Sequence, residues 1–206
     1  MILKNINHLA FITNDMVKTI RFYRDLLQMK LSSGIGHDGY RHYFFQLGDG
    51  ASHIAFFEYD GASPMMKKFP GERTNQPLGF DHVSFTVNTK NELFAMKDRL
   101  DTAGFSTHGA IDHGLIWSIY FYDPNNIPLE VSWECLELIA APAIEEDDPL
   151  EIVDEGADPQ PGFWPSVKDP TPTSEMKAHS GNGKPMRDSF LARGLARIRE
   201  DKLETE

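Results

Sequence analysis

The sequence is short of cysteine, of long apolar runs and of positive charge. Cys135 is the only cysteine, so no disulfide can form within the chain, and a reducing cytoplasm is the expected location. No run of about 18 apolar residues is present, so we expect no membrane span and no membrane partner. The formal net charge of −11 repels polyanions and argues against a nucleic-acid partner.

The chain does have enough apolar and aromatic residues for one core. Hydrophobic residues make up 40% and aromatic residues 11% of the 206 positions, which fits one domain with an extension. Residues 1–5 lack the layout of a signal peptide and lead straight into a predicted strand. Because the composition changes near residue 138, we expect a domain over 1–138 and an extension over 139–206.

Two pentads in the predicted domain share one pattern: a polar residue, His, an aliphatic residue, a small residue and Phe. The first contains His8 and the second contains His82, while Glu130 lies in a third strand-like segment. Two imidazoles and one carboxylate on rigid strands can occupy one face of a metal ion and leave the other face open to small ligands. We therefore predict that these three residues bind a metal ion.

The two pentads open two copies of one module. In each copy a strand is followed by a helix and then by further strands, and the first helix has apolar residues at spacings of three and four. The predicted strands are 8–12, 40–47, 53–59, 82–87, 116–122 and 127–133, with weaker strands from 31, and the predicted helices are 16–27 and 90–103. This order predicts an α+β fold of paired βαβββ modules, at about 1–70 and 71–138, that form a curved mixed sheet with a metal-binding cleft.

The extension is predicted to be irregular with one helix. Residues 140–161 contain no Lys or Arg, and residues 163–185 are rich in Pro, Ser, Thr and Gly. Such segments bury too little apolar surface to fold alone, although Phe163 and Trp164 are expected to dock. Apolar residues at helical spacing over 186–203 predict an amphipathic helix that packs on the domain or on a neighbour. Because these apolar residues have no evident partner within the extension, we expect a homodimer.

Two motifs resemble the vicinal oxygen chelate superfamily, which includes glyoxalase I, extradiol ring-cleaving dioxygenases and bleomycin-resistance proteins. One is the Phe-Tyr pair at residues 22–23 of the first predicted helix. The other is the aromatic strand, Asp-Pro turn and Glu across residues 120–130. The resemblance covers about residues 1–135 and implies paired modules whose metal ligands come from the first and last strands of each module. The three predicted ligands match three of these four positions.

The fourth position lies within residues 54–58, on the last strand of the first module. If the last strands of the two modules end at equivalent positions, Phe56 occupies the fourth ligand position. Glu58 lies two residues further along and points to the same face. With Phe56 the ion has three protein ligands and the open positions that a bidentate catecholate and dioxygen need. With Glu58 the ion has four ligands, as the resemblance to glyoxalase I implies.

The resemblance to extradiol enzymes also implies roles outside the ligand set. His53 corresponds to an acid–base group of those enzymes. A His suits this role, because a side chain with a pKa of about 6.5 can move a proton near neutral pH. Tyr120 corresponds to a tyrosine whose hydroxyl orients the substrate, and His113 corresponds to a further catalytic His. The residues expected to line the pocket in part are Phe44, Phe56, Trp117 and Phe121. The histidines interpreted as surface or loop residues are His37, His42, His108 and His179.

Together these residues predict a cytoplasmic extradiol-type dioxygenase that uses iron(II), Fe²⁺, to cleave a small catecholic aromatic with dioxygen, O2. Mn²⁺, Ni²⁺ and Zn²⁺ are the alternative ions. The alternative function is a glyoxalase- or epimerase-like isomerase or lyase, which transfers a proton without oxygen. A further alternative is a resistance-type protein that binds a flat ligand without catalysis, although that branch of the superfamily lacks a metal triad.

Overall fold

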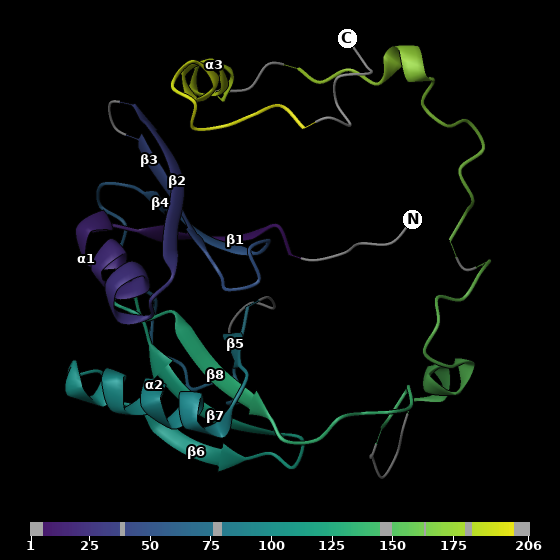
Figure 1. The fold of residues 1–206 in the computed structure, drawn as a ribbon. Helices are drawn as coiled ribbons and strands as arrows, with labels where there is room; N and C mark the ends of the chain where they lie inside the picture. Colours follow the sequence, from purple (N-terminus) through teal and green to yellow (C-terminus); the bar gives the residue numbers. More distant parts are fainter. Residues whose placement is uncertain are drawn as a thin grey trace. The chain divides into compact units, whose positions relative to one another are not determined.

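The computed structural model describes residues 6–37, 40–75, 80–144, 150–162, 164–179 and 183–199 (Figure 1). The contacts within the chain divide it into two compact units, Met1–Glu137 and Leu138–Glu206. The first unit holds both sheets and two α-helices, which confirms the α+β class and the paired βαβββ modules.

The first module is a four-stranded sheet in the order β1-β4-β3-β2, with β1 parallel to β4 and the other neighbours antiparallel. Its elements are β1 (His8–Thr13), α1 (Met16–Ile20), the π-helix η1 (Arg21–Leu26), β2 (Lys30–His37), β3 (Tyr40–Gln46) and β4 (His53–Glu58). The helix begins after Asp15, whose side chain accepts a hydrogen bond from the backbone N–H of Lys18 at 2.9 Å. The predicted helix over 16–27 is therefore present, with a π-helical second half.

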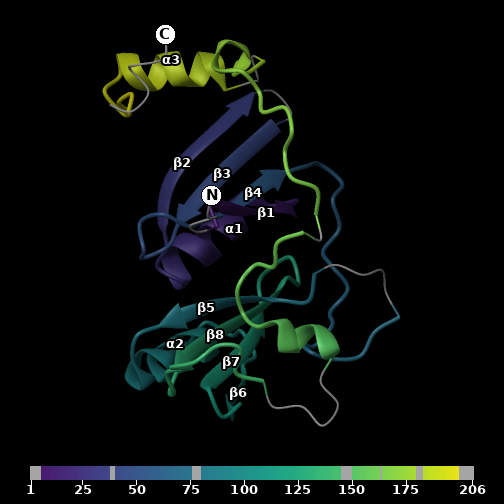
Figure 2. The same ribbon diagram turned by 90° about the vertical axis from the view of Figure 1, so that its right-hand side faces the viewer.

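The second module repeats this topology in the order β5-β8-β7-β6, and Figure 2 shows the strands of each sheet side by side. Its elements are β5 (Val83–Val87), α2 (Lys90–Thr102), β6 (His108–Asp112), β7 (Ile116–Tyr122) and β8 (Pro128–Glu134). A capping box of Thr89 and Glu92 starts α2. Gly104, at φ +83°, ends it in a Schellman turn, because the Phe105 N–H reaches the Leu100 carbonyl at 3.0 Å.

One hydrophobic core draws on both modules. Its buried apolar side chains include Phe45, Ile54 and Phe56 from the first module and Leu93, Ile119, Phe121 and Leu129 from the second. Burial of each such side chain stabilises the fold by about 1.5–3 kcal/mol. Polar contacts cross the same boundary, because the Thr13 hydroxyl donates to the Asn125 side chain at 2.9 Å. The two modules therefore fold as one packed body.

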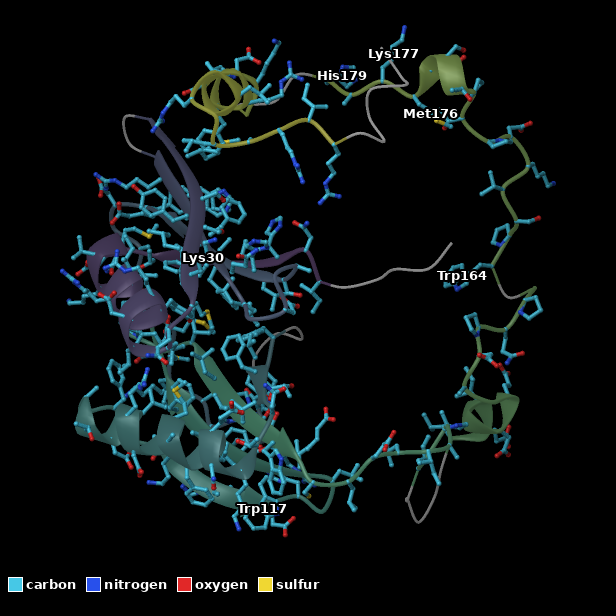
Figure 3. The ribbon with its side chains drawn as sticks, in the orientation of Figure 1. Lys30, Trp117, Trp164, Met176, Lys177 and His179 are labelled. Atoms are coloured by element: carbon cyan, nitrogen blue, oxygen red, sulfur yellow. The ribbon has the colours of Figure 1, made fainter. Side chains whose placement is uncertain are left out.

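The second unit contains α3 (Lys184–Ala192) and the short 3₁₀ turns η2 (Glu151–Glu155) and η3 (Thr173–Glu175). The prediction that this helix continues to residue 203 is wrong for its described part, because Gly194, at φ +66°, ends it. Trp164 is 80% exposed and stands out from the irregular chain (Figure 3). Phe163 lies outside the described residues. No helix in the described ranges is both long and apolar enough to cross a bilayer.

Candidate metal centre

Strand alternation gives the first sheet two chemically different faces. Phe56 points into the core, whereas His8 and His53 belong to the opposite face, where the parallel β1–β4 register makes them direct neighbours. Phe44 is paired with Ala55 and so lies on this opposite face as well. We call this surface the aromatic face; its members are His8, His42, Phe44, His53, Ala55 and Phe57.

The corresponding face of the second sheet is polar. Glu130 on β8 is flanked by Ser84 of β5 and by Tyr120 of β7. His82 directly precedes β5, and alternation places it on the same face as Ser84. The Ser84 and Ser132 hydroxyl oxygens are 3.0 Å apart on this face. We call it the polar face of the second sheet.

His82 and Glu130 form the centre of the polar face. The Nε2 atom of His82 lies 3.0 Å from Oε2 of Glu130, and the Glu130 side chain is only 4% exposed. The other carboxylate oxygen, Oε1, is buried and has no hydrogen-bond partner among the described residues. A buried carboxylate oxygen without a partner is costly, and a cation relieves that cost.

The spacing of these two atoms suits a metal ion. Two ligand atoms bound at right angles with bonds of about 2.1 Å stand about 3 Å apart. In addition, a neutral imidazole and a carboxylate are both ligands of divalent transition metals. The pair therefore fits two ligand positions on one ion.

Asp81 fixes the other side of the His82 ring. Its Oδ1 atom is 2.6 Å from Nδ1 of His82, and its Oδ2 atom accepts from the Lys68 ammonium at 2.5 Å. The Lys68 hydrogen bond first, and that of His82 second, hold the pKa of Asp81 well below its usual range. Sequence reasoning did not find either residue. Asp81 occupies the polar first position of the second pentad, which could have pointed to it. No sequence pattern marks Lys68.

Tyr120 and His113 lie beside this pair. The Tyr120 hydroxyl is 2.9 Å from Nε2 of His113, and its ring stands edge-on to the His82 ring at a centroid distance of 6.0 Å. Burial, and then the negative charge of Glu130, raise the pKa of Tyr120. Phe69, from the segment between the modules, packs against the Tyr120 ring at 5.5 Å. Four of the six predicted site residues thus gather on or beside the polar face.

The remaining two predicted site residues belong to the aromatic face. Nδ1 of His8 lies 2.8 Å from the Asn7 side-chain oxygen, and Nδ1 of His53 lies 3.2 Å from the Asn7 carbonyl oxygen. Within the described ranges, no three His, Cys, Asp or Glu side chains converge closely enough to hold a metal ion. A single copy of the chain therefore presents the His82–Glu130 pair without His8.

The register corrects the prediction for the fourth ligand position. Glu130 is paired with Ser84, two residues after His82, and the equivalent pair in the first module is Ala10 with Ala55. Ala55 is therefore the counterpart of Glu130, and the placement of Phe56 there is wrong.

Glu58 has a structural role on the core side of the first sheet. It is two residues after Phe56 on β4 and shares its face, so it lies on the face opposite to His8. Its carboxylate accepts from the Met16 backbone N–H at 2.7 Å and pairs with Arg41. Glu58 is therefore not positioned as a fourth ligand.

The aromatic face also changes the predicted pocket lining. Phe44 lies on it, but Phe56 and Phe121 are buried in the core, and Trp117 packs edge-on against Trp133. His42, interpreted from sequence as a surface residue, is only 7% exposed, and its ring stacks on Phe57 at a centroid distance of 3.6 Å. His108 and His179 are exposed, and nothing is described of the His37 side chain.

Comparisons with known proteins identify a family for the first unit. Residues 5–131 match the sequence model described as the Glyoxalase/Bleomycin resistance protein/Dioxygenase superfamily. No curated protein matches the chain. Among solved structures, the chain is similar to a glyoxylase/bleomycin resistance protein/dioxygenase domain from Frankia sp. EAN1pec, with 25% identity and a TM-score of 0.55. That match covers 64% of this chain and 98% of that one.

Two further solved structures share the fold at lower identity. A glyoxalase family protein from Enterococcus faecalis is 22% identical with a TM-score of 0.50, and the match covers 64% of this chain and 99% of that one. A mutant of the fosfomycin resistance protein FosX from Listeria monocytogenes, complexed with Mn(II) and a dihydroxypropylphosphonic acid, is 19% identical with a TM-score of 0.50. That match covers 66% of this chain and 96% of that one.

Proposed function

The chain belongs to the Glyoxalase/Bleomycin resistance protein/Dioxygenase superfamily, and from that premise we propose that it is a metal-dependent enzyme. The ion is held by His8, His82 and Glu130. The observation that carries the proposal is the His82–Glu130 pair, with a 3.0 Å ligand-atom spacing and a buried carboxylate oxygen that has no partner among the described residues. The single cysteine favours a reducing, cytoplasmic setting.

The reaction we propose is extradiol cleavage of a small catecholic aromatic by O2. Ala55 at the counterpart of Glu130 leaves three protein ligands and therefore open positions for two small ligands. When bound, iron(II) would supply the electron chemistry that dioxygen requires and lower the pKa of a catechol hydroxyl. Both oxygen atoms of O2 enter the product as the ring carbon–carbon bond beside the diol breaks, so no further reductant is consumed.

Three side chains handle protons and orientation in this proposal. The Nδ1–H of His53 donates to the Asn7 carbonyl, which leaves Nε2 of His53 to take and return the substrate proton. The Tyr120 hydroxyl holds a substrate oxygen in place, and its bond with His113 fixes the direction of that hydroxyl. Phe44 and Phe57 offer the aromatic ring a stacking surface on the aromatic face.

A second copy of the chain completes the ligand set. The His8 side of β1 is exposed along its length, and it includes Ile12, an apolar residue that is 54% exposed. An exposed apolar residue on the same face as a metal ligand favours a surface that another protein chain covers when the enzyme assembles. In a two-fold homodimer, His8 of one copy would meet His82 and Glu130 of the other, and the two-fold axis would create two such sites.

A glyoxalase- or epimerase-like isomerase or lyase is the second candidate, and the chemistry of the polar face favours it. Ser84 and Ser132 place two hydroxyls, 3.0 Å apart, beside Glu130, and such a lining suits a polar substrate better than an aromatic ring. The FosX structure that shares this fold contains Mn(II) and a phosphonic acid, which agrees with a polar ligand in a site of this kind.

Oxygen consumption separates the two candidates. The protein is purified anaerobically, loaded with iron(II), and assayed against a panel of simple catechols for oxygen uptake and a yellow ring-fission product. Glu130→Gln serves as the ligand-deficient control. Turnover that depends on Glu130 and on oxygen supports the dioxygenase. Tight metal binding without oxygen uptake across the panel contradicts it and leaves the isomerase or lyase.

A further inference from the structure

The segment that joins the two modules is fastened to the second sheet. The Met65 backbone N–H donates to the Asn125 carbonyl at 2.8 Å, and the Asn126 side-chain amide donates to the Met65 carbonyl at 2.8 Å. Both partners lie in the turn between β7 and β8. These two bonds bring the residues that follow Met65 close to the polar face.

Residues 68–72 then close around the Asp81 carboxylate. The Lys68 ammonium donates to Oδ2 of Asp81 at 2.5 Å and to the backbone carbonyls of Phe69 and Glu72 at 3.0 and 3.3 Å. The Gly71 N–H donates to Oδ1 of Asp81 at 2.9 Å. Three acceptors fix the Lys68 ammonium, and the Asp81 carboxylate is in turn fixed by two groups from the linker. This arrangement is far more specific than a single surface ion pair.

The same carboxylate sets the orientation of His82. Because Asp81 is an acceptor at 2.6 Å from Nδ1, the ring carries its proton on Nδ1 and turns Nε2 toward Glu130. A carboxylate behind a metal-binding imidazole orients the ring and makes its free nitrogen a better donor. A continuous series of side-chain contacts therefore runs from Lys68 through Asp81 and His82 to Glu130.

We propose that Lys68 and Asp81 are positioning residues of the metal site. The segment that joins the two modules, the inter-module linker, therefore helps to orient a metal ligand. This inference rests on the proposed function, because it assumes an ion on His82 and Glu130. Lys68 holds Asp81, and Asp81 holds His82 with Nε2 aimed at the ion. The alternative is that Lys68 only tethers the linker to the sheet, in which case its loss would change stability but not metal affinity.

Calorimetric titration with Mn(II) tests the positioning role. Asp81→Asn is expected to weaken Mn(II) binding by about 10–100-fold. Lys68→Met is expected to weaken it in the same direction by a smaller factor, and Lys68→Arg to keep it near the wild-type value. Lys67→Met is the matched control, because Lys67 lies over the Tyr122 ring at 5.3 Å, on a different partner from that of Lys68.

Nuclear magnetic resonance of Zn(II)-loaded protein with ¹⁵N-labelled histidine gives a second readout. The Nδ1 proton of His82 should resonate far downfield and exchange slowly, whereas in Lys68→Met it should shift upfield and exchange faster. Wild-type affinity and an unchanged His82 resonance in both Lys68→Met and Asp81→Asn would overturn the positioning role alone. A wild-type protein that binds neither ion would overturn the proposed metal site, and this inference with it.

Discussion

The Tyr23 hydroxyl donates a hydrogen bond to the Asp123 carboxylate at 3.2 Å, across the boundary between the two modules. Both residues are buried, one in the π-helix after α1 and the other in the turn before β8. Asp123 also accepts from the backbone N–H groups of Asn125 and Ile127, each at 2.8 Å. The two motifs that resembled the superfamily, the Phe-Tyr pair and the Asp-Pro turn, are thus partners in one structural contact.

Tyr23→Phe should lower the free energy of unfolding by about 1.5–3 kcal/mol, because it removes a buried hydrogen bond to a charged group. Urea denaturation followed by circular dichroism measures this loss. Tyr59→Phe is the matched control on an exposed tyrosine and should change little. Equal stability of the Tyr23 variant and wild type would contradict the role of this contact in joining the modules.

Asp123→Asn should change how stability depends on pH. Burial raises the pKa of Asp123 above its ordinary value of 3.8, so the folded state holds this proton more tightly than the unfolded chain does. The wild type therefore loses stability relative to the Asn variant as pH rises from about 3.8 through the raised pKa, and the difference is constant above it. Urea midpoints of both proteins between about pH 4 and 7 measure it. A difference independent of pH would be the contrary result.

Glu58→Gln should leave metal binding unchanged and reduce stability by about 1 kcal/mol or less, since it breaks a partly exposed ion pair with Arg41. The amide oxygen can still accept from the Met16 N–H. Mn(II) titration and thermal unfolding of the same variant separate the two effects. A loss of Mn(II) affinity would show that Glu58 reaches the ion and would restore the four-ligand site.

Tyr120→Phe should reduce kcat by about 10²-fold with the best catechol, because the hydroxyl that orients the substrate is lost. Mn(II) affinity should remain near that of the wild type, since Tyr120 bonds with His113 rather than serving as a ligand. Oxygen-uptake kinetics and metal titration are compared on one preparation. An unchanged kcat would mean that Tyr120 is only a packed aromatic residue.

Much of the fold could be predicted because local signals agreed with each other. Apolar residues at helical spacing and the repeated His pentads placed nearly every element of the first unit. β6 was not predicted on its own, since it is short and interrupted after Gly109, where its pairing with β7 is irregular. The end of α3 was predicted too far along the chain, because apolar residues continue at helical spacing beyond Gly194. The positive φ of Gly194 ends the helix before them.

The site was less predictable, for two physical reasons. Residues 54–57 are apolar without alternation, so the sequence does not show which of Ala55 and Phe56 faces the core, and a shift of one residue reverses the face. Lys68 meets Asp81 only through tertiary folding of the linker, which has no periodic pattern to read. By contrast, Glu130 and Tyr120 lie on strands and His82 directly precedes one, all within clear motifs, and the fold brings them together.

Complementation between two inactive variants tests the central claim most directly. His8→Ala and His82→Ala are expressed separately and together with different tags, and the mixed dimer is isolated and titrated with Mn(II). If His8 of one copy joins His82 and Glu130 of the other, each variant alone binds weakly, while the mixed dimer regains one tight site of the two, or about half of wild-type capacity. No recovery in the mixed dimer would contradict a site shared between copies.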